Sequence, residues 1–91
     1  EARDLLEDPE GMLKKLCTRL VIPFYKEMLT WPAGRRKCDG IWGKYWYGSV
    51  ERSTGFQHYS KKTPIVPSEY EELFLNCMKY YQQLYQHRMR I

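Results

Sequence analysis

The last third of the chain constrains the fold most, because a helix-start signal there precedes a long helical repeat of apolar residues. Ser68 and Glu71 have the spacing of a capping box, in which each side chain accepts a hydrogen bond from the other residue's backbone N–H. Apolar residues then recur every three or four positions for about four turns, at Tyr70, Leu73, Phe74, Cys77, Met78, Tyr81, Leu84 and Tyr85. The pattern predicts an amphipathic helix over residues 68–88 that begins at the capping box.

A second helix-start signal lies near the beginning of the chain, at Asp8 and Pro9. The Asp8 carboxylate can accept from the first free backbone N–H groups, and proline is favoured at the first helical position. An apolar stripe follows at Met12, Leu13, Leu16, Cys17 and Leu20. Pro23 disfavours helical backbone at the residue before it, so we predict a helix over residues 9–21.

The middle of the chain gives weaker signals. Residues 24–29 can form a short helix, and the aromatic and aliphatic residues after Gly40 recur near helical spacing up to Val50. We therefore predict a helix over 40–53, with Gly55 as its left-handed stop. Residues 57–67 form a polar loop, and no run of alternating β-branched residues predicts a strand. The expected fold is mostly α, with about four helices.

Length and composition limit the class of protein. A chain of 91 residues with 43% hydrophobic residues forms one domain or less, and no stretch approaches the ~20 apolar residues that cross a bilayer. We expect no membrane span. The chain does not begin with Met and has no secretory signal, so we expect part of a longer or processed protein that is not exported.

The three cysteines, Cys17, Cys38 and Cys77, are odd in number and widely spaced. This spacing suits neither a disulfide framework nor a zinc site. We expect free, reduced thiols, no metal and a cytoplasmic location.

Charge is distributed unevenly along the chain, whose net charge is +4. Residues 1–10 hold five acids and one base, whereas residues 35–62 hold seven bases and two acids. The basic middle either attracts an anionic partner or forms a solvated face. The acidic start and the absence of a nucleic-acid-binding signature argue against nucleic acid.

No familiar self-contained catalytic signature is present. His58 and His87 lie far apart in the sequence, and nothing supports Ser53 or Ser60 as a nucleophile. We therefore assign no catalytic residue and no metal ligand, and we expect no turnover from these residues alone.

The basic segment that begins at Arg35 is the candidate binding site. Arg35, Arg36 and Lys37 precede a predicted helix N-terminus at Gly40, where free N–H groups and the helix dipole favour a phosphate or sulfate. Trp42, together with Trp46 and Tyr47, either flanks a purine or packs against a neighbouring part of the fold.

Three stretches of the sequence resemble a known family: ARDLLEDPEGMLKKLCTRLVIPF, MLTWPAG and DGIWGKYWYGSVERSTGF. They are similar to the C-terminal part of P-loop sulfotransferases, in the branch often labelled branched-chain-aminotransferase-like. Arg35 and Arg36, followed by Gly40 and Trp42, resemble the family's Arg-Lys-Gly…Gly-x-Trp loop. Lys37 stands where that loop usually has Gly, and Ile41 where it often has Asp.

The resemblance implies that this chain is part of a larger α/β fold and that it helps to bind a cofactor. In that family the loop grips the 3′-phosphate of the sulfate donor, 3′-phosphoadenosine 5′-phosphosulfate, which makes Arg35, Arg36, Gly40 and Trp42 the expected cofactor-binding residues. The 5′-phosphosulfate loop and the general base would lie upstream, in an α/β core against which this part packs. Residues 1–56 carry the resemblance, 57–67 are the loop and 68–91 the last helix, for which no family motif is found.

A second reading stays open on the residues alone. The basic, aromatic-rich loop could belong to a small helical interaction module that binds an acidic partner. An independent enzyme is the least favoured reading.

Overall fold

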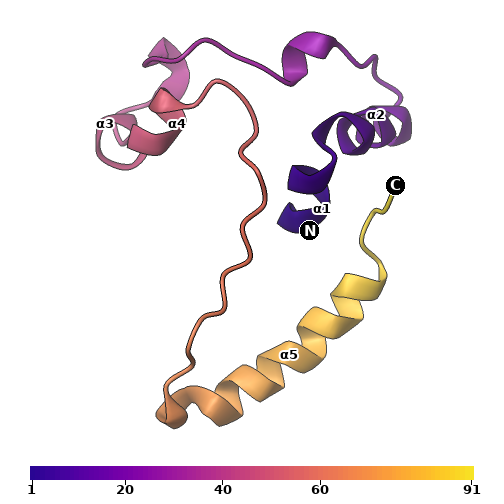
Figure 1. Cartoon of the computed structure of the whole chain (residues 1–91), viewed down its shortest axis with the longest axis vertical. Helices are drawn as coiled ribbons and strands as arrows, with labels where there is room; N and C mark the ends of the chain where they lie inside the picture. The colour runs from indigo at the N-terminus through magenta and orange to yellow at the C-terminus, as the bar shows by residue number, and fades with distance from the viewer.

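The computed structural model describes residues 1–91, and it is helical without a strand (Figure 1). The α-helices are α1 (Ala2–Glu7), α2 (Pro9–Leu20), α3 (Gly43–Trp46), α4 (Gly48–Arg52) and α5 (Glu71–Gln86). Three 3-10 turns are η1 (Lys26–Met28), η2 (Lys37–Asp39) and η3 (Ser68–Tyr70). The mostly α fold class is confirmed. None of the helices combines the length and the apolar character that a bilayer crossing requires.

Helix α2 begins as predicted. An oxygen of the Asp8 carboxylate accepts a hydrogen bond from the Gly11 N–H at 2.9 Å, and Pro9 occupies the first turn. The helix ends at Leu20 with Val21 in the left-handed conformation, at φ 56°. The N–H of Ile22 donates to the Cys17 carbonyl and that of Val21 to the Thr18 carbonyl, so a Schellman motif ends the helix before Pro23 does.

The Asp8 cap should stabilise α2. We expect Asp8→Ala to destabilise the helix by ~1 kcal/mol, because one N–H at its start loses its acceptor. Asp8→Asn keeps an acceptor oxygen in the same place and should cost much less. Thermal unfolding followed by circular dichroism compares the two variants; equal losses would show that the negative charge, and not the hydrogen bond, matters.

The middle helices differ from the prediction. Residues 24–29 form only η1, and the helix predicted over 40–53 is divided into α3 and α4 on either side of Tyr47. Gly40 takes φ 72° and lies outside both helices, and glycine at positions 43 and 48 lowers helix propensity further. Gly55 is not left-handed; it forms a single antiparallel bridge with Thr30 instead.

The last helix is present, but its predicted capping box does not form. Neither η3 nor α5 has a side-chain hydrogen bond at its N-cap. The chain enters α5 through the 3-10 turn, in which the Tyr70 N–H donates to the Pro67 carbonyl at 2.9 Å. This tighter turn gives Ser68 and Glu71 a different relative position from the one that a capping box requires.

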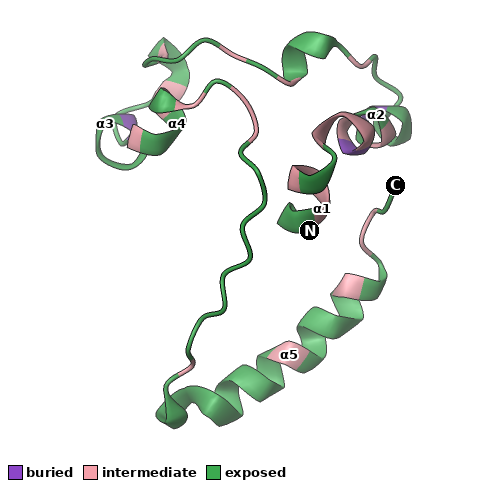
Figure 2. Cartoon of the chain, viewed as in Figure 1, coloured by how far each residue is buried: buried purple, intermediate pink, exposed green.

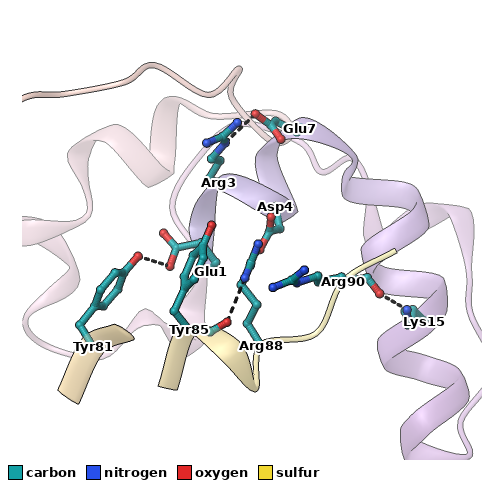
Figure 3. Close-up of polar contacts among 9 residues, drawn as sticks. All are labelled: Glu1, Arg3, Asp4, Glu7, Lys15, Tyr81, Tyr85, Arg88 and Arg90. Atoms are coloured by element: carbon teal, nitrogen blue, oxygen red, sulfur yellow. Dashed lines mark hydrogen bonds and ion pairs between the residues drawn. The ribbon is translucent and has the colours of Figure 1, made fainter. Parts of the chain in front are cut away.

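The C-terminal end of α5 returns to the start of the chain, as Figure 3 shows. Arg88 Nε lies 2.9 Å from Asp4 Oδ2, and the guanidinium stacks over the Tyr85 ring. The Tyr81 hydroxyl donates to the Glu1 carboxylate at 2.9 Å, which raises the pKa of Tyr81. Lys15 also donates to the Arg90 carbonyl. These contacts hold only the end of α5, and its other turns lie away from the remaining helices (Figure 1).

The chain buries little of itself. Three residues are buried, Met12 and Cys17 in α2 and Gly43 in α3, while α5 has none (Figure 2). The accessible surface is 8267 Å², whereas a folded monomer of this mass exposes about 5,600 Å². The radius of gyration is 17.0 Å, against about 12 Å for a compact domain of this length. The chain therefore exposes about 2,600 Å² more than a self-contained domain would.

Candidate functional site

Cationic side chains surround one hollow between η2 and α3, which we call the basic hollow. Its volume is ≈ 330 Å³, within the ~300–1,000 Å³ of small-molecule sites. The lining residues are Arg35, Arg36, Lys37, Gly40, Ile41 and Lys44. Four cations around one space make a site for an anion such as a phosphate.

Glycine gives this loop its shape at two positions. Gly34 has φ 125° and Gly40 has φ 72°, a region that residues with a Cβ rarely adopt. A Cβ built on Gly40 would meet no atom within 4 Å, so the backbone there stays open to a ligand. The two glycines bracket the three consecutive cations and turn the chain before and after them.

Each arginine of the basic hollow is held at one point. Arg35 Nε lies 3.5 Å from Oε1 of Glu51, a residue of α4. Arg36 donates from Nη2 to the Pro32 carbonyl at 3.2 Å, and its backbone N–H donates to Asp39 Oδ2 at 3.0 Å. Each guanidinium therefore keeps further N–H groups that can donate to a ligand.

The loop that carries these arginines is anchored next to α4 by Trp31. Its indole N–H donates to the Ser53 hydroxyl at 2.9 Å, and its backbone N–H donates to the Thr54 carbonyl at 3.0 Å. The ring meets Phe56 edge to face, with centroids 5.5 Å apart. These contacts, with the Thr30–Gly55 bridge, fix the segment just before the basic hollow.

The structure brings three of the four predicted site residues together. Arg35, Arg36 and Gly40 line the basic hollow, whereas Trp42 does not. Trp42 stacks on Trp46 at a centroid distance of 5.4 Å, and both rings are largely exposed. Sequence reasoning did not include Lys44 in the site, although Lys44 lies four positions after Gly40, one turn along the helix that was predicted there.

The predicted helix N-terminus at Gly40, which was expected to favour an anion, is wrong. No helix begins at Gly40: α3 starts at Gly43 and has four residues, too few for a substantial dipole. The side-chain cations therefore carry the positive potential of the site.

Other chemistry-bearing residues are dispersed. Cys17, Cys38 and Cys77 are unlinked, the first buried and the other two exposed. No group of three or more His, Cys, Asp or Glu side chains is placed to hold a metal ion.

Comparison with known proteins gives a family match over nearly the whole chain. The model described as "Sulfotransferase domain" matches residues 1–88, which includes the last helix, where the sequence showed no family motif. The chain is 39% identical over 87 residues to branched-chain-amino-acid aminotransferase-like protein 1 of Arabidopsis thaliana, covering 96% of this chain. It is 38% identical over 81 residues to protein 2 of the same name and organism, covering 89% of this chain.

The chain spans only a small part of the length of these relatives. The aligned part is 16% of the length of protein 1 and 14% of protein 2. No solved structure gives a significant match. The family match covers far more than half of the chain, and the basic loop that resembled sulfotransferases lies inside it. The chain belongs to the sulfotransferase domain family.

Proposed function

We propose that the basic hollow binds the 3′-phosphate of the sulfate-donor nucleotide, 3′-phosphoadenosine 5′-phosphosulfate. The observation that carries this proposal is the gathering of Arg35, Arg36, Lys37 and Lys44 around one space beside Gly40. A nucleotide with an extra phosphate at the 3′ position is the ligand that a member of this family would bring to such a site.

The residues present fit a phosphate group. The two guanidiniums supply planar, charge-assisted donors, and the two ammonium groups add charge without directional demands. Gly40 leaves room for the ligand to approach the backbone. When bound, the nucleotide would supply the sulfuryl group for transfer, while these side chains would bind and orient it from its 3′ end.

The open surface supports a second part of the proposal, in which this chain packs against an α/β core. The relatives are several times longer than the aligned part, so they have room for such a core. The chain exposes about 2,600 Å² beyond the expectation for its size, which is enough for an obligate contact. Exposed Leu73, Phe74 and Leu84 on α5 would contribute to that contact.

In sulfuryl transfer, this part would then bind and orient the 3′-phosphate. The rest of the protein would supply the reacting groups. The three unlinked cysteines support the further proposal of a cytoplasmic location.

NMR titration of the isotope-labelled chain with adenosine 3′,5′-bisphosphate tests where the nucleotide binds. We expect millimolar affinity, about −4 kcal/mol, because only one side of the nucleotide is contacted. Amide shifts should concentrate at Arg35, Arg36 and Gly40 and should shrink as salt is added. Shifts confined to residues 81–90, at the end of α5 and just after it, would contradict the proposal and favour an interaction module that binds an acidic partner.

A further inference from the structure

We infer that Glu51 is a positioning residue that holds the Arg35 guanidinium at the edge of the basic hollow, an inference that rests on the proposed phosphate site. Glu51 lies in α4 and does not line the hollow. Its carboxylate is the one acidic group paired with a cation of the hollow, through the 3.5 Å contact between Oε1 and Arg35 Nε.

Burial distinguishes the two partners. The Glu51 side chain is 26% exposed and that of Arg35 is 59% exposed. The Oε1 atom of Glu51 is buried and has no hydrogen-bond partner, so Arg35 is its only nearby charge compensation. A buried carboxylate oxygen without a hydrogen bond is costly, which favours keeping the guanidinium close to it.

The backbone of Glu51 reinforces this arrangement. Its carbonyl accepts from the Gly34 N–H at 2.7 Å, directly before Arg35, and its own N–H donates to the Tyr47 carbonyl at 2.7 Å. Glu51 therefore ties two successive residues of the basic loop to α4, one through its backbone and one through its side chain.

The contact involves the Nε end of the guanidinium and leaves the two Nη groups to donate elsewhere. The Arg35 side chain donates no hydrogen bond within the chain and makes only the ion pair with Glu51, whereas Arg36 already donates one from Nη2 to Pro32. With Nε drawn toward Glu51, the two free Nη groups can make a bidentate contact with a phosphate. Glu51 thus restricts the side chain before the ligand arrives.

For Glu51→Ala, this inference predicts a change in phosphate affinity opposite in sign to the change that simple electrostatics predicts. A carboxylate beside an anion site lowers its positive potential, so charge alone would make Glu51→Ala bind phosphate more tightly. Loss of positioning instead makes Glu51→Ala bind more weakly, because the freed Arg35 side chain must be ordered by the ligand.

The experiment measures the affinity of adenosine 3′,5′-bisphosphate by NMR titration for Glu51→Ala and Glu51→Gln. We expect Glu51→Ala to weaken binding about five- to tenfold, the scale of the rotamer freedom of an Arg side chain. Glu51→Gln keeps the length of the side chain but loses the charge that attracts the guanidinium, so it should also weaken binding, by less than Glu51→Ala. Unchanged or tighter binding by Glu51→Ala would overturn the inference.

Two controls separate this inference from the phosphate site itself. In an Arg35→Ala background, Glu51→Ala should have no further effect, and a persisting effect would show that Glu51 does not act through Arg35. Glu72→Ala removes an exposed, unpaired acid from α5 and should leave affinity unchanged. If Arg35→Ala weakens binding and Glu51→Ala does not, positioning fails while the phosphate site stands; if neither variant matters, the phosphate site fails.

Hydrogen exchange at the Gly34 amide reports separately on whether Glu51→Ala loosens the local fold. Its hydrogen bond goes to the Glu51 backbone carbonyl, which every substitution at this position retains. Unchanged hydrogen exchange at Gly34 together with weaker binding supports positioning. Fast exchange at Gly34 in Glu51→Ala and in Glu51→Gln alike, with equal losses of affinity, would mean a structural role and would overturn the inference.

Discussion

Replacing Arg35 and Arg36 together with Ala should abolish detectable binding of adenosine 3′,5′-bisphosphate to the chain. Each guanidinium can give charge-assisted hydrogen bonds worth about 1.5–3 kcal/mol, so the pair contributes most of a millimolar affinity. The two remaining cations, Lys37 and Lys44, supply charge but no planar donor pair. NMR titration up to tens of millimolar nucleotide, at about 0.1 M salt, is the measurement.

The matched control is the double variant Lys61→Ala/Lys62→Ala. It also removes two adjacent, exposed cations from a loop, but from the extended 57–67 segment and outside the basic hollow. We expect its affinity to stay within about twofold of the unaltered chain, the difference being general charge attraction. Equal losses in the two double variants would mean that the nucleotide responds to net charge and not to this site.

Trp31→Ala should release the basic loop from α4. The substitution removes the edge-to-face contact with Phe56 and the indole hydrogen bond to Ser53. Large-to-small substitutions at buried aromatic residues cost about 3–5 kcal/mol, and the half-buried Trp31 should lose about 2 kcal/mol of local stability. Hydrogen exchange at the Gly34 amide should therefore accelerate about 30-fold, since 1.4 kcal/mol corresponds to tenfold.

Trp46→Ala is the control for this substitution. Trp46 is 72% exposed and stacks only on Trp42, so its removal should change exchange at Gly34 by less than about twofold. If Trp31→Ala leaves Gly34 exchange unchanged, another contact anchors the loop. The Thr30–Gly55 bridge would then be the first candidate.

The elements that sequence predicted well depend on local chemistry. The Asp8-Pro9 start of α2 formed as expected, because a cap needs only residues within one turn of each other. The long stripe after residue 70 identified α5, since periodicity over four turns outweighs an uncertain start. The start itself was wrong, because the same Ser68-to-Glu71 spacing also fits a 3-10 turn.

The helix predicted over 40–53 shows the limit of periodicity. Its aromatic spacing was helical, yet the chain breaks at Tyr47 and leaves Gly40 in a left-handed conformation. Three glycines in that stretch each cost about 1 kcal/mol relative to Ala, and an exposed segment has little packing to offset this. The short α1 was missed because six residues are too few to show a repeat.

The sequence predicted the consecutive cations of the candidate site, but not Lys44 and not the residues that support the loop. Arg35, Arg36 and Gly40 are close in sequence, so a loop brings them together. Glu51 reaches Arg35 and Trp31 reaches Ser53 across a fold that periodicity does not determine. The contact between Arg88 and Asp4, at opposite ends of the chain, could not be predicted from local patterns for the same reason.

The central claim is that the basic hollow recognises a phosphate at the 3′ position of a nucleotide. The most direct test compares the affinities of adenosine 3′,5′-bisphosphate and adenosine 5′-monophosphate for the unaltered chain under identical salt. If the hollow holds the 3′-phosphate, the bisphosphate should bind at least about tenfold more tightly, the effect of roughly one charge-assisted contact. Equal affinities, or equal shifts at Arg35 and Arg36 with both nucleotides, would contradict the claim.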